Sequence, residues 1–339
     1  MIKSIDDLSS LLASCPGPDQ GAVEAWGRRE PLLTKPQGSL GRLEEIVRWL
    51  SSWQGRHPPS LDNVRARIFA GNHGVTAQGV SAYPTEVTHQ MVLNFQQGGA
   101  AINQLCRTND VELTALALEL EKPTEDFTQS PAMTEDGFVA AFNAGFKSVP
   151  NHTDLLVLGE MGIGNTSAAA AVSCALFGGE AAEWVGAGTG VEGDGMARKV
   201  AAVAAGVKLH AGSAPLEILR RLGGRELAAM AGAVVAARLA RVPVLLDGYV
   251  CCAAVAPLAA AVPGALDHCL VAHVSAEPGH RRLLDRLDKK PLLDLGMRLG
   301  EGSGAALAVG LVRSALACHT GMATFTQAGV SGKGEKPPV

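Results

Sequence analysis

The strongest structural pattern in this chain is the stretch Asp154-Leu-Leu-Val-Leu-Gly-Glu-Met-Gly-Ile-Gly-Asn-Thr-Ser-Ala-Ala-Ala-Ala-Val172. Its apolar run over residues 155–158 is typical of a buried strand in a parallel sheet. Glycines at positions 159, 162 and 164 then interrupt the run, and the alanines from Ala168 onward predict a helix. Asn165 and Thr166 lie where that helix would begin, and their side chains can accept hydrogen bonds from its free backbone amides. The stretch therefore predicts a strand, a glycine loop and a helix in succession.

A unit of this kind is typical of an anion-binding site. Glycine lets the backbone come close to a phosphate, and the positive end of the helix dipole favours the phosphate charge. The loop lacks the Lys-Ser/Thr pair of a P-loop, and its glycine spacing differs from the dinucleotide-binding fingerprint. An ordinary tight turn between a strand and a helix is the alternative. Glu160 argues against it, because a carboxylate inside such a loop needs a cationic or hydrogen-bonding partner. We expect a phosphate or sugar phosphate as the ligand.

The composition of the 339-residue chain indicates a layered α/β enzyme. Apolar residues make up 47% of the chain, enough for a sizeable core, whereas aromatic residues make up only 4%. The core must therefore consist of Ala, Val and Leu, and the 40 glycines permit close packing and tight turns. The formal net charge of −4 provides no basic field, so we expect no nucleic-acid partner.

Cysteine spacing and hydropathy argue against a metal site and a membrane protein. The seven cysteines include no C-x-x-C pair, and the histidines between residues 268 and 280 follow no zinc-ligand spacing. The first residues show no basic segment followed by an apolar core, so no signal peptide is expected. The apolar run over residues 228–246 is interrupted by Arg238, Arg241 and Pro243, which favours a buried helix and strand over a membrane span. We expect a soluble cytoplasmic protein without a metal or other cofactor.

Strand and helix patterns alternate from about residue 65 to residue 290. Besides the strand described above, apolar runs predict strands at residues 65–70, 111–118, 242–246 and 270–274 and a short one around Trp184. This alternation is typical of a mostly parallel sheet with helices on both faces, in a Rossmann-like three-layer arrangement. Residues 1–56 are more polar and are predicted to be helical. The Gly-, Lys- and Pro-rich tail from Ser331 is predicted to be disordered.

Two further positions each have a functional and a structural interpretation. Tyr83 stands beside Ser81 and Pro84 in a segment after a strand, where an open α/β sheet binds its ligands. It faces a planar ligand, or it lies in a simple surface turn. Lys199 lies on the helix after a second glycine loop, Gly186-Ala-Gly-Thr-Gly190. It contacts a phosphate, or it lies on a solvated helix face, which is the commoner situation for a single lysine.

Glu301 stands between Gly300 and Gly302, immediately before a predicted helix. An acid at this place complements the helix dipole or serves as a functional acid. The flanking glycines favour the second interpretation, because they would expose the side chain on a loop that ligands can approach.

A set of motifs, in the same order along the chain, together resembles one enzyme family. The motifs are Leu33-Thr-Lys-Pro-Gln-Gly-Ser-Leu-Gly, Gly71-Asn-His-Gly-Val, Gly79-Val-Ser-Ala-Tyr-Pro, Gly159-Glu-Met-Gly-Ile-Gly-Asn-Thr, Gly186-Ala-Gly-Thr-Gly, Glu277-Pro-Gly-His, Arg298-Leu-Gly-Glu-Gly-Ser-Gly-Ala-Ala, and Met322-Ala-Thr-Phe with Ala328-Gly-Val-Ser. The family is nicotinate-nucleotide–dimethylbenzimidazole phosphoribosyltransferase, which prepares the lower ligand of cobalamin. The likeness extends from about residue 30 to residue 332, so chance convergence does not explain it.

The resemblance implies transfer of ribose 5-phosphate from nicotinate mononucleotide to 5,6-dimethylbenzimidazole. The products would be nicotinate and α-ribazole 5′-phosphate, and no metal is needed because the pyridinium is a good leaving group. A base must take the azole N–H proton while the other ring nitrogen attacks. Glu301 matches the family's catalytic carboxylate and is expected to be that base. Glu160 matches a second active-site carboxylate that faces the ribose or the developing positive charge.

The resemblance also implies two binding regions. The expected nucleotide and phosphate contacts are Gly162, Ile163, Gly164, Asn165, Thr166, Gly188, Thr189, Gly190, Lys199 and Ser275. The expected azole pocket consists of Ser81, Tyr83, Leu299 and a polar residue, Gln90 or His89. Two positions depart from the family's pattern: Ala187 stands in place of Arg, and Glu192-Gly193-Asp194 stands in place of two adjacent acids. Both departures concern contacts near the second glycine loop, and neither involves the catalytic carboxylate.

The family fold agrees with the helical pattern at the chain ends. It predicts a small helical domain of residues 1–56 and 303–339 and a large α/β catalytic domain of residues 57–302. The family is dimeric, so the resemblance implies a homodimer. Two alternatives stay open. One is phosphoribosyl transfer to another azole or to a phenol, since a hydrophobic pocket distinguishes a methyl group by only about 1–3 kcal/mol. The other is a non-catalytic azole or nucleotide sensor of the same fold.

Overall fold

The centre of the molecule is a sheet of parallel strands. The computed structural model describes residues 1–331, and within them the strands lie in the order β2-β1-β3-β4-β5. Their bounds are Val64–Ala70 for β1, Glu112–Ala117 for β2, Leu155–Met161 for β3, Val244–Leu246 for β4 and Cys269–Val271 for β5. β1 lies between β2 and β3, with Ile68 in register with Ala115 and Gly159. The predicted parallel sheet is confirmed.

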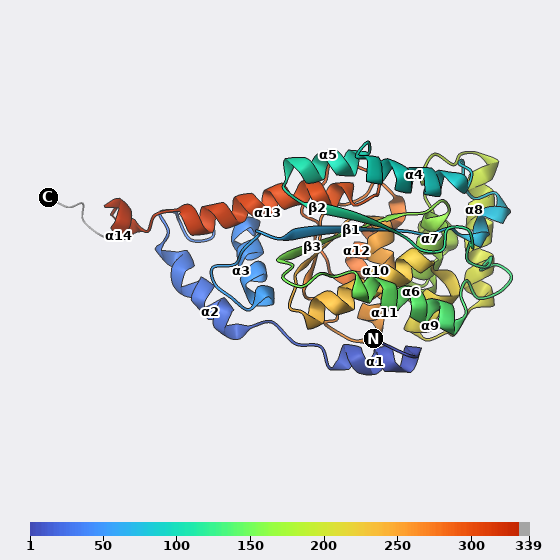
Figure 1. The fold of residues 1–339 in the computed structure, drawn as a ribbon, viewed down its shortest axis with the longest axis horizontal. Coiled ribbons are helices and arrows are strands. Elements are labelled where there is room, and N and C mark those ends of the chain that lie inside the picture. Colours follow the sequence, from blue (N-terminus) through green and yellow to red (C-terminus); the bar gives the residue numbers. More distant parts are fainter. Residues whose placement is uncertain (332–339) are drawn as a thin grey trace.

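Helices cover both faces of this sheet (Figure 1). In chain order they are α1 (Ile5–Ala13), α2 (Gln20–Arg29), α3 (Arg42–Gln54), α4 (Glu86–Gln97), α5 (Ala101–Thr108), α6 (Glu135–Lys147), α7 (Asn165–Phe177), α8 (Asp194–Leu209), α9 (Pro215–Leu222), α10 (Arg225–Leu239), α11 (Tyr249–Ala261), α12 (Pro278–Leu287), α13 (Ser303–Gly321) and α14 (Phe325–Ala328). Between residues 1 and 331 no helix combines the length and the apolar character that a membrane crossing requires.

Each face of the sheet has its own hydrophobic core. On β3, Leu156 and Leu158 contribute to a core with α6, α7, α10 and α11. Leu155 and Val157 contribute to a second core with α3, α5 and α13. Successive side chains of a strand point to opposite faces, so a strand between two helical layers is apolar at every position. This is why residues 155–158 show no alternation, and it confirms the predicted three-layer α/β fold.

α2, α14 and the last part of α13 lie together at one end of the molecule, next to α3 (Figure 1). Lys35 connects them, because its ammonium nitrogen lies 2.8 Å from Glu30 Oε1 and 2.7 Å from Glu44 Oε1. Glu30 in turn lies 2.5 Å from Nδ1 of His319 on α13. The motif over residues 33–41 is thus part of an ion cluster that joins the N-terminal helices to the C-terminal one. Removing one member would leave a charge without its partner in a buried place, which is strongly destabilising.

The first helix departs from the predicted grouping of the chain ends. Ile5, Leu8 and Leu12 of α1 are buried in the same core as α6 and α10. Asn143 of α6 also exchanges two hydrogen bonds with the backbone of Ile2. α1 therefore packs on the α/β body through its apolar face, whereas α2 packs against α3, which in turn contacts α13 and the sheet. The tail that was predicted to be disordered lies outside the described residues, apart from its first one.

Two strand assignments need correction. The segment around Trp184 forms a short 3-10 helix, η3 (Ala181–Glu183), followed by a loop rather than by a strand. Trp184 is fully buried, and its indole N–H donates to the carbonyl oxygen of Gly178. So short an apolar run does not distinguish a strand from a helical turn. In contrast, β3 is longer than predicted, and Glu160 lies on the strand rather than in the loop.

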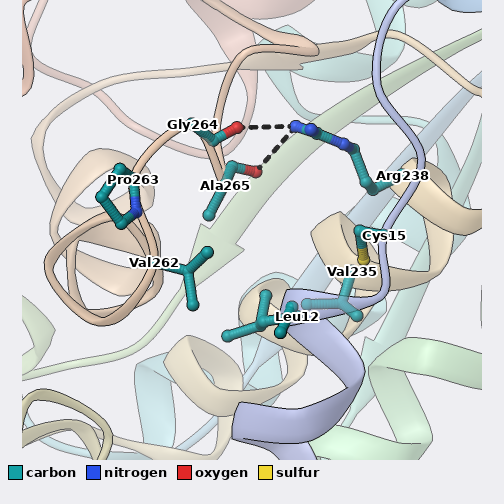
Figure 2. Close-up of a pocket in the computed structure, with 9 residues that line it drawn as sticks. Leu12, Cys15, Val235, Arg238, Val262, Pro263, Gly264 and Ala265 are labelled. Carbon is teal, nitrogen blue, oxygen red and sulfur yellow. Dashed lines mark hydrogen bonds between the residues drawn. The ribbon is translucent and has the colours of Figure 1, made fainter.

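Arg238 on α10 contacts three other segments and lines a cavity of about 140 Å³ (Figure 2). Its Nη1 donates to the carbonyl oxygens of Gly264 and Ala265, at 2.7 and 3.4 Å. Its Nε donates to the carbonyl oxygen of Pro16 at 2.7 Å. The guanidinium also lies 4.5 Å from the centre of the Trp53 ring. One side chain thus holds together α10, α3, the segment after α1 and the loop before β5.

Replacing Arg238 by methionine should lower the free energy of unfolding by about 2–3 kcal/mol, since one hydrogen bond to a charged group contributes about 1.5–3 kcal/mol. The methionine keeps an apolar chain but leaves the carbonyl groups without their donor. Urea unfolding measures the change. Arg241→Met is the control, because Arg241 makes an exposed hydrogen bond to Gly17. Its change should stay within about 0.5 kcal/mol. Equal losses in both variants would contradict the special role of Arg238.

Candidate active site

A cavity of about 630 Å³ lies at the carboxyl ends of β3, β4 and β5. Open parallel sheets bind their ligands outside these strand ends. The wall includes these residues that the sequence predicted: Tyr83, Glu160, Gly162, Ile163, Asn165, Thr166, Gly188, Thr189, Ser275, Leu299 and Glu301. It also includes residues that the sequence analysis did not assign to a site: Val87, Met91, Met161, Gly248, Tyr249, Val250, His273, Glu277, Arg298 and Gly300. The structure therefore brings both predicted carboxylates and both glycine loops to one cavity.

Glu301 lies just before α13 in a backbone conformation that favours glycine. Its φ is +62°, and the φ angles of Gly300 and Gly302 are +78° and +76°. A left-handed conformation costs a non-glycine residue about 1–3 kcal/mol, so the surrounding structure must hold this turn in place. The residue is only 8% exposed. The flanking glycines thus serve the turn and its close packing, and they do not expose Glu301 as the sequence suggested.

Asp247, which the sequence analysis did not assign to a site, holds this turn. It directly follows β4 and is fully buried. Its Oδ2 accepts a hydrogen bond from the N–H of Gly302 at 3.1 Å, and its Oδ1 accepts one from Ala305 at 2.8 Å. Burial, together with the charge of Asp247, raises the pKa of Glu301 to about 7. A carboxyl group with this pKa can exchange a proton near neutral pH. The available sequence signal was the position of Asp247 at a strand end.

His273, after β5, supports Asp247 from the cavity side. Its Nε2 lies 3.5 Å from Asp247 Oδ1. Burial disfavours the charged imidazolium, but hydrogen bonding and the charge of Asp247 outweigh burial and raise the pKa of His273. An added Cβ at Gly304 would lie 2.0 Å from the imidazole, so glycine is required where the ring packs against α13. The sequence analysis considered His273 only as a metal ligand, for which the spacing gave no support.

Glu160 reaches the same cavity from the end of β3. An added Cβ at Gly159 would lie 2.4 Å from the backbone nitrogen of Gly302, so this glycine lets the first turn of α13 pack directly on the strand. Burial raises the pKa of Glu160 to about 8, although Asn165 donates a hydrogen bond to its carboxylate. Two carboxyl groups with raised pKa values therefore share one cavity, which is typical of a functional site.

Two glycine loops form another part of the wall. Gly164 precedes α7 with a φ of +95°. The first residues of α7, Asn165 and Thr166, line the cavity. In the second loop, the N–H of Gly188 donates to Glu277 Oε1 at 2.8 Å. Gly164 and Gly190 are not on the wall themselves, and Gly190 is exposed with open space beside it. Loops of this kind offer backbone N–H groups and a helix N-terminus to an anion.

Lys199 of α8 lies behind both loops rather than on the wall. Its Nζ donates to Thr166 Oγ1 at 2.8 Å and to the carbonyl oxygen of Gly186 at 2.9 Å. The residue is 1% exposed, so the solvated helix face that its pattern favoured is wrong. Burial lowers the pKa of Lys199 to about 8, an effect that the charge of Glu277 opposes. One buried ammonium group thus connects the two loops and places a positive charge behind them.

Apolar side chains form the remaining part of the wall. Tyr83 and Leu299 are 51% and 54% exposed and lie where a flat ligand could cover them. Ser81 is not on the wall. Its hydroxyl group donates a hydrogen bond to the carbonyl oxygen of Tyr83. Gln90 and its alternative His89 are exposed on α4, and neither lines the cavity. The side chains that α4 contributes are apolar: Val87 and Met91.

Similarity to known proteins identifies the family. A family model described as phosphoribosyltransferase matches residues 15–330. The nicotinate-nucleotide–dimethylbenzimidazole phosphoribosyltransferase of Mesorhizobium japonicum is 60% identical over 98% of this chain and 99% of its own. This chain belongs to that family. The protein of the same name from Rhizobium etli is 59% identical over 97% of each chain.

A solved structure agrees with this phosphoribosyltransferase family. The crystal structure of CobT from Thermus thermophilus is 42% identical and superposes with a TM-score of 0.85, over 92% of this chain and 99% of that one. The α/β fold and the family predicted from the motifs are therefore confirmed. The whole cavity wall lies within the residues that match the family model, and so does Asp247.

Proposed function

We propose that this chain transfers ribose 5-phosphate from nicotinate mononucleotide to 5,6-dimethylbenzimidazole, which releases nicotinate and forms α-ribazole 5′-phosphate. The observation that carries the proposal is that the Glu301 carboxyl group and the glycine loop before α7 share one cavity. The first provides a base, and the second provides an anion site. The names of the relatives support the same reaction.

The reaction is a displacement at C1′ of the ribose. The bond from C1′ to the pyridinium nitrogen breaks, and its electron pair stays with the nicotinate ring. A ring nitrogen of dimethylbenzimidazole supplies the pair for the new bond to C1′, while the Glu301 carboxylate takes the proton from the other nitrogen. General-base assistance contributes about 10²–10⁴-fold to such a rate. Holding the azole and C1′ in attack geometry supplies the rest.

Glu160 is suited to the ribose and its developing positive charge. With a pKa of about 8, it is largely protonated in the empty cavity at neutral pH, and a protonated carboxyl group both donates and accepts hydrogen bonds. Positive charge on the bound donor favours its ionised form. Glu160 therefore contacts the ribose as the bond to nicotinate breaks and stabilises the cationic state.

The anionic groups of the donor match the loops and a cation of the wall. The start of α7 and the ammonium group of Lys199 suit the 5′-phosphate. Arg298 lines the cavity, and its Nη1 donates to the carbonyl oxygen of Gly188 at 3.1 Å. A guanidinium group can bind a carboxylate or phosphate through several N–H groups at once. Tyr83 and Leu299 would then cover the faces of the azole.

The rate should depend on pH through Glu301 and Lys199. Glu301 acts as a base only when ionised, so kcat/KM for the donor should fall as the pH drops below about 7. Lys199 attracts phosphate only when charged, so kcat/KM should fall again above about pH 8. Asp247→Asn removes a negative charge beside Glu301, which lowers the pKa of that carboxyl group and moves the acidic limb to lower pH. Initial rates across the neutral range check this, and an unmoved acidic limb would contradict it.

Product analysis tests the proposal directly. The purified protein is incubated with nicotinate mononucleotide and dimethylbenzimidazole without added metal. The products are then separated by chromatography and identified by mass spectrometry. We expect nicotinate and α-ribazole 5′-phosphate in equal amounts. Competition with adenine, benzimidazole and phenol then ranks the acceptors. Absence of product, with dimethylbenzimidazole still binding in calorimetry, would overturn the proposal in favour of a sensor.

A further inference from the structure

A buried, hydrogen-bonded pair of side chains lies beneath the first glycine loop. His73 follows β1 in the motif over residues 71–75, and Glu226 lies in the first turn of α10. His73 Nε2 lies 2.5 Å from Glu226 Oε1, and the two residues are 1% and 0% exposed. Neither residue lines the cavity, so neither takes part in the steps described above. The pair nevertheless connects β1 and α10 at the carboxyl edge of the sheet.

We propose that the His73–Glu226 pair positions the loop over residues 162–165 for the phosphate of the donor. This inference rests on the proposed function, because it assigns a role in that reaction to residues that do not contact the substrates. Both residues are therefore positioning residues rather than catalytic ones.

The loop packs closely against the pair. An added Cβ at Gly162 would lie 2.6 Å from the carbonyl oxygen of Gly71, 3.2 Å from Glu226 Oε1 and 3.4 Å from His73 Nε2. An added Cβ at Gly164 would lie 3.3 Å from the Cβ of His73. These glycines therefore lie against the pair and against the Gly71 carbonyl and Thr76 beside it, and a substitution at either would crowd this support. The interpretation that glycine serves only the approach of phosphate was incomplete.

Glycines on the other side of the pair show the same fit. An added Cβ at Gly71 would lie 2.4 Å from Glu226 Oε2, and one at Gly224 would lie 2.3 Å from the imidazole of His73. Backbone therefore encloses the pair on several sides. A displacement of either side chain would be transmitted to the loop, since close-packed interiors deform little.

Stability alone does not account for the pair. Within residues 1–331, neither Nδ1 of His73 nor Oε2 of Glu226 has a hydrogen-bond partner. Buried polar atoms without partners are destabilising, and well-packed apolar residues often replace a buried ion pair without loss. A short hydrogen bond does provide direction and distance, which apolar packing does not. The arrangement fits a requirement for a precisely placed loop.

Donor affinity measured by calorimetry tests the inference. Glu226→Leu removes the hydrogen bond, and we expect the Kd of nicotinate mononucleotide to rise about 10-fold or more, as for loss of one charge-assisted hydrogen bond. The Kd of dimethylbenzimidazole should stay within about twofold, because the proposed azole contacts, Tyr83 and Leu299, lie outside this loop. Glu226→Gln keeps a hydrogen-bonding oxygen for His73 and should restore donor affinity to within about threefold. His210→Gln is the matched control, since His210 is a buried histidine that bonds to Phe127 outside the cavity.

Several outcomes would overturn the inference. One is an unchanged donor Kd in Glu226→Leu, and another is an equal rise for donor and acceptor, which would indicate a general loss of structure. If Glu226→Leu does not fold, His73→Met, which removes the hydrogen-bonding nitrogen, replaces it, with hydrogen exchange of residues 160–168 as the measure and Glu226→Gln as the variant that should keep normal protection. Faster exchange there, with residues 303–309 unchanged, supports the inference, and equal protection contradicts it. If the unaltered protein binds the donor but forms no product, only the proposed function fails. If it binds no donor, both fail.

Discussion

Glu301→Gln should lower turnover by about 10²–10⁴-fold, the usual contribution of general-base catalysis. An amide cannot take the azole proton, yet it matches the carboxylate in shape and can keep the turn before α13. The backbone N–H groups of that turn bond to Asp247 rather than to the Glu301 side chain, so the site should stay assembled. Binding of dimethylbenzimidazole should therefore persist while the chemical step is lost.

Single-turnover rates and calorimetry on the same preparation separate these two effects. Asp294→Asn is the matched control, because it makes the same carboxylate-to-amide change on the segment that leads to Glu301. Asp294 is exposed and pairs with Arg281 at 2.8 Å, away from the cavity wall. The turnover rate of the Asp294→Asn variant should stay within about twofold of that of the unaltered protein. An unchanged turnover rate in Glu301→Gln would show that Glu301 is not the general base.

Lys199→Met should weaken binding of nicotinate mononucleotide by about 10–100-fold, because it removes the buried positive charge behind the two glycine loops and the hydrogen bonds that connect them, each of which contributes about 1.5–3 kcal/mol. Methionine fills a similar volume without a charge. It would leave Thr166 and the Gly186 carbonyl without the donor that now connects the two loops. The alkaline limb of the pH profile should also disappear, since its titrating group is gone.

Steady-state kinetics with each substrate varied in turn measure this effect. The KM of the donor should rise, and the KM of dimethylbenzimidazole should change little. Lys208→Met is the control, because Lys208 lies on the same helix, α8, but is exposed. Retention of the alkaline limb in Lys199→Met would show that another group produces it.

The sequence by itself determined the elements of the fold and their order. The uninterrupted apolar run over residues 155–158 predicted a strand covered on both sides, and two separate cores lie against it. The order of the motifs predicted the family, and the glycine loops and two carboxylates of those motifs meet in one cavity. Such features are local, because strand periodicity, helix starts and turn glycines depend on neighbouring residues.

Burial and long-range support were decided by the tertiary structure. Lys199 matched a solvated helix face and Glu301 an exposed loop, yet both are buried, and their pKa values shift for that reason. Asp247 holds a turn more than fifty residues further along the chain, and Glu226 pairs with a histidine 153 residues away. Periodicity carries no information on such pairs, since they form only when separate strands and helices pack together. The sequence determined which groups are present. Packing decided which of them are buried, which are charged and which contact one another.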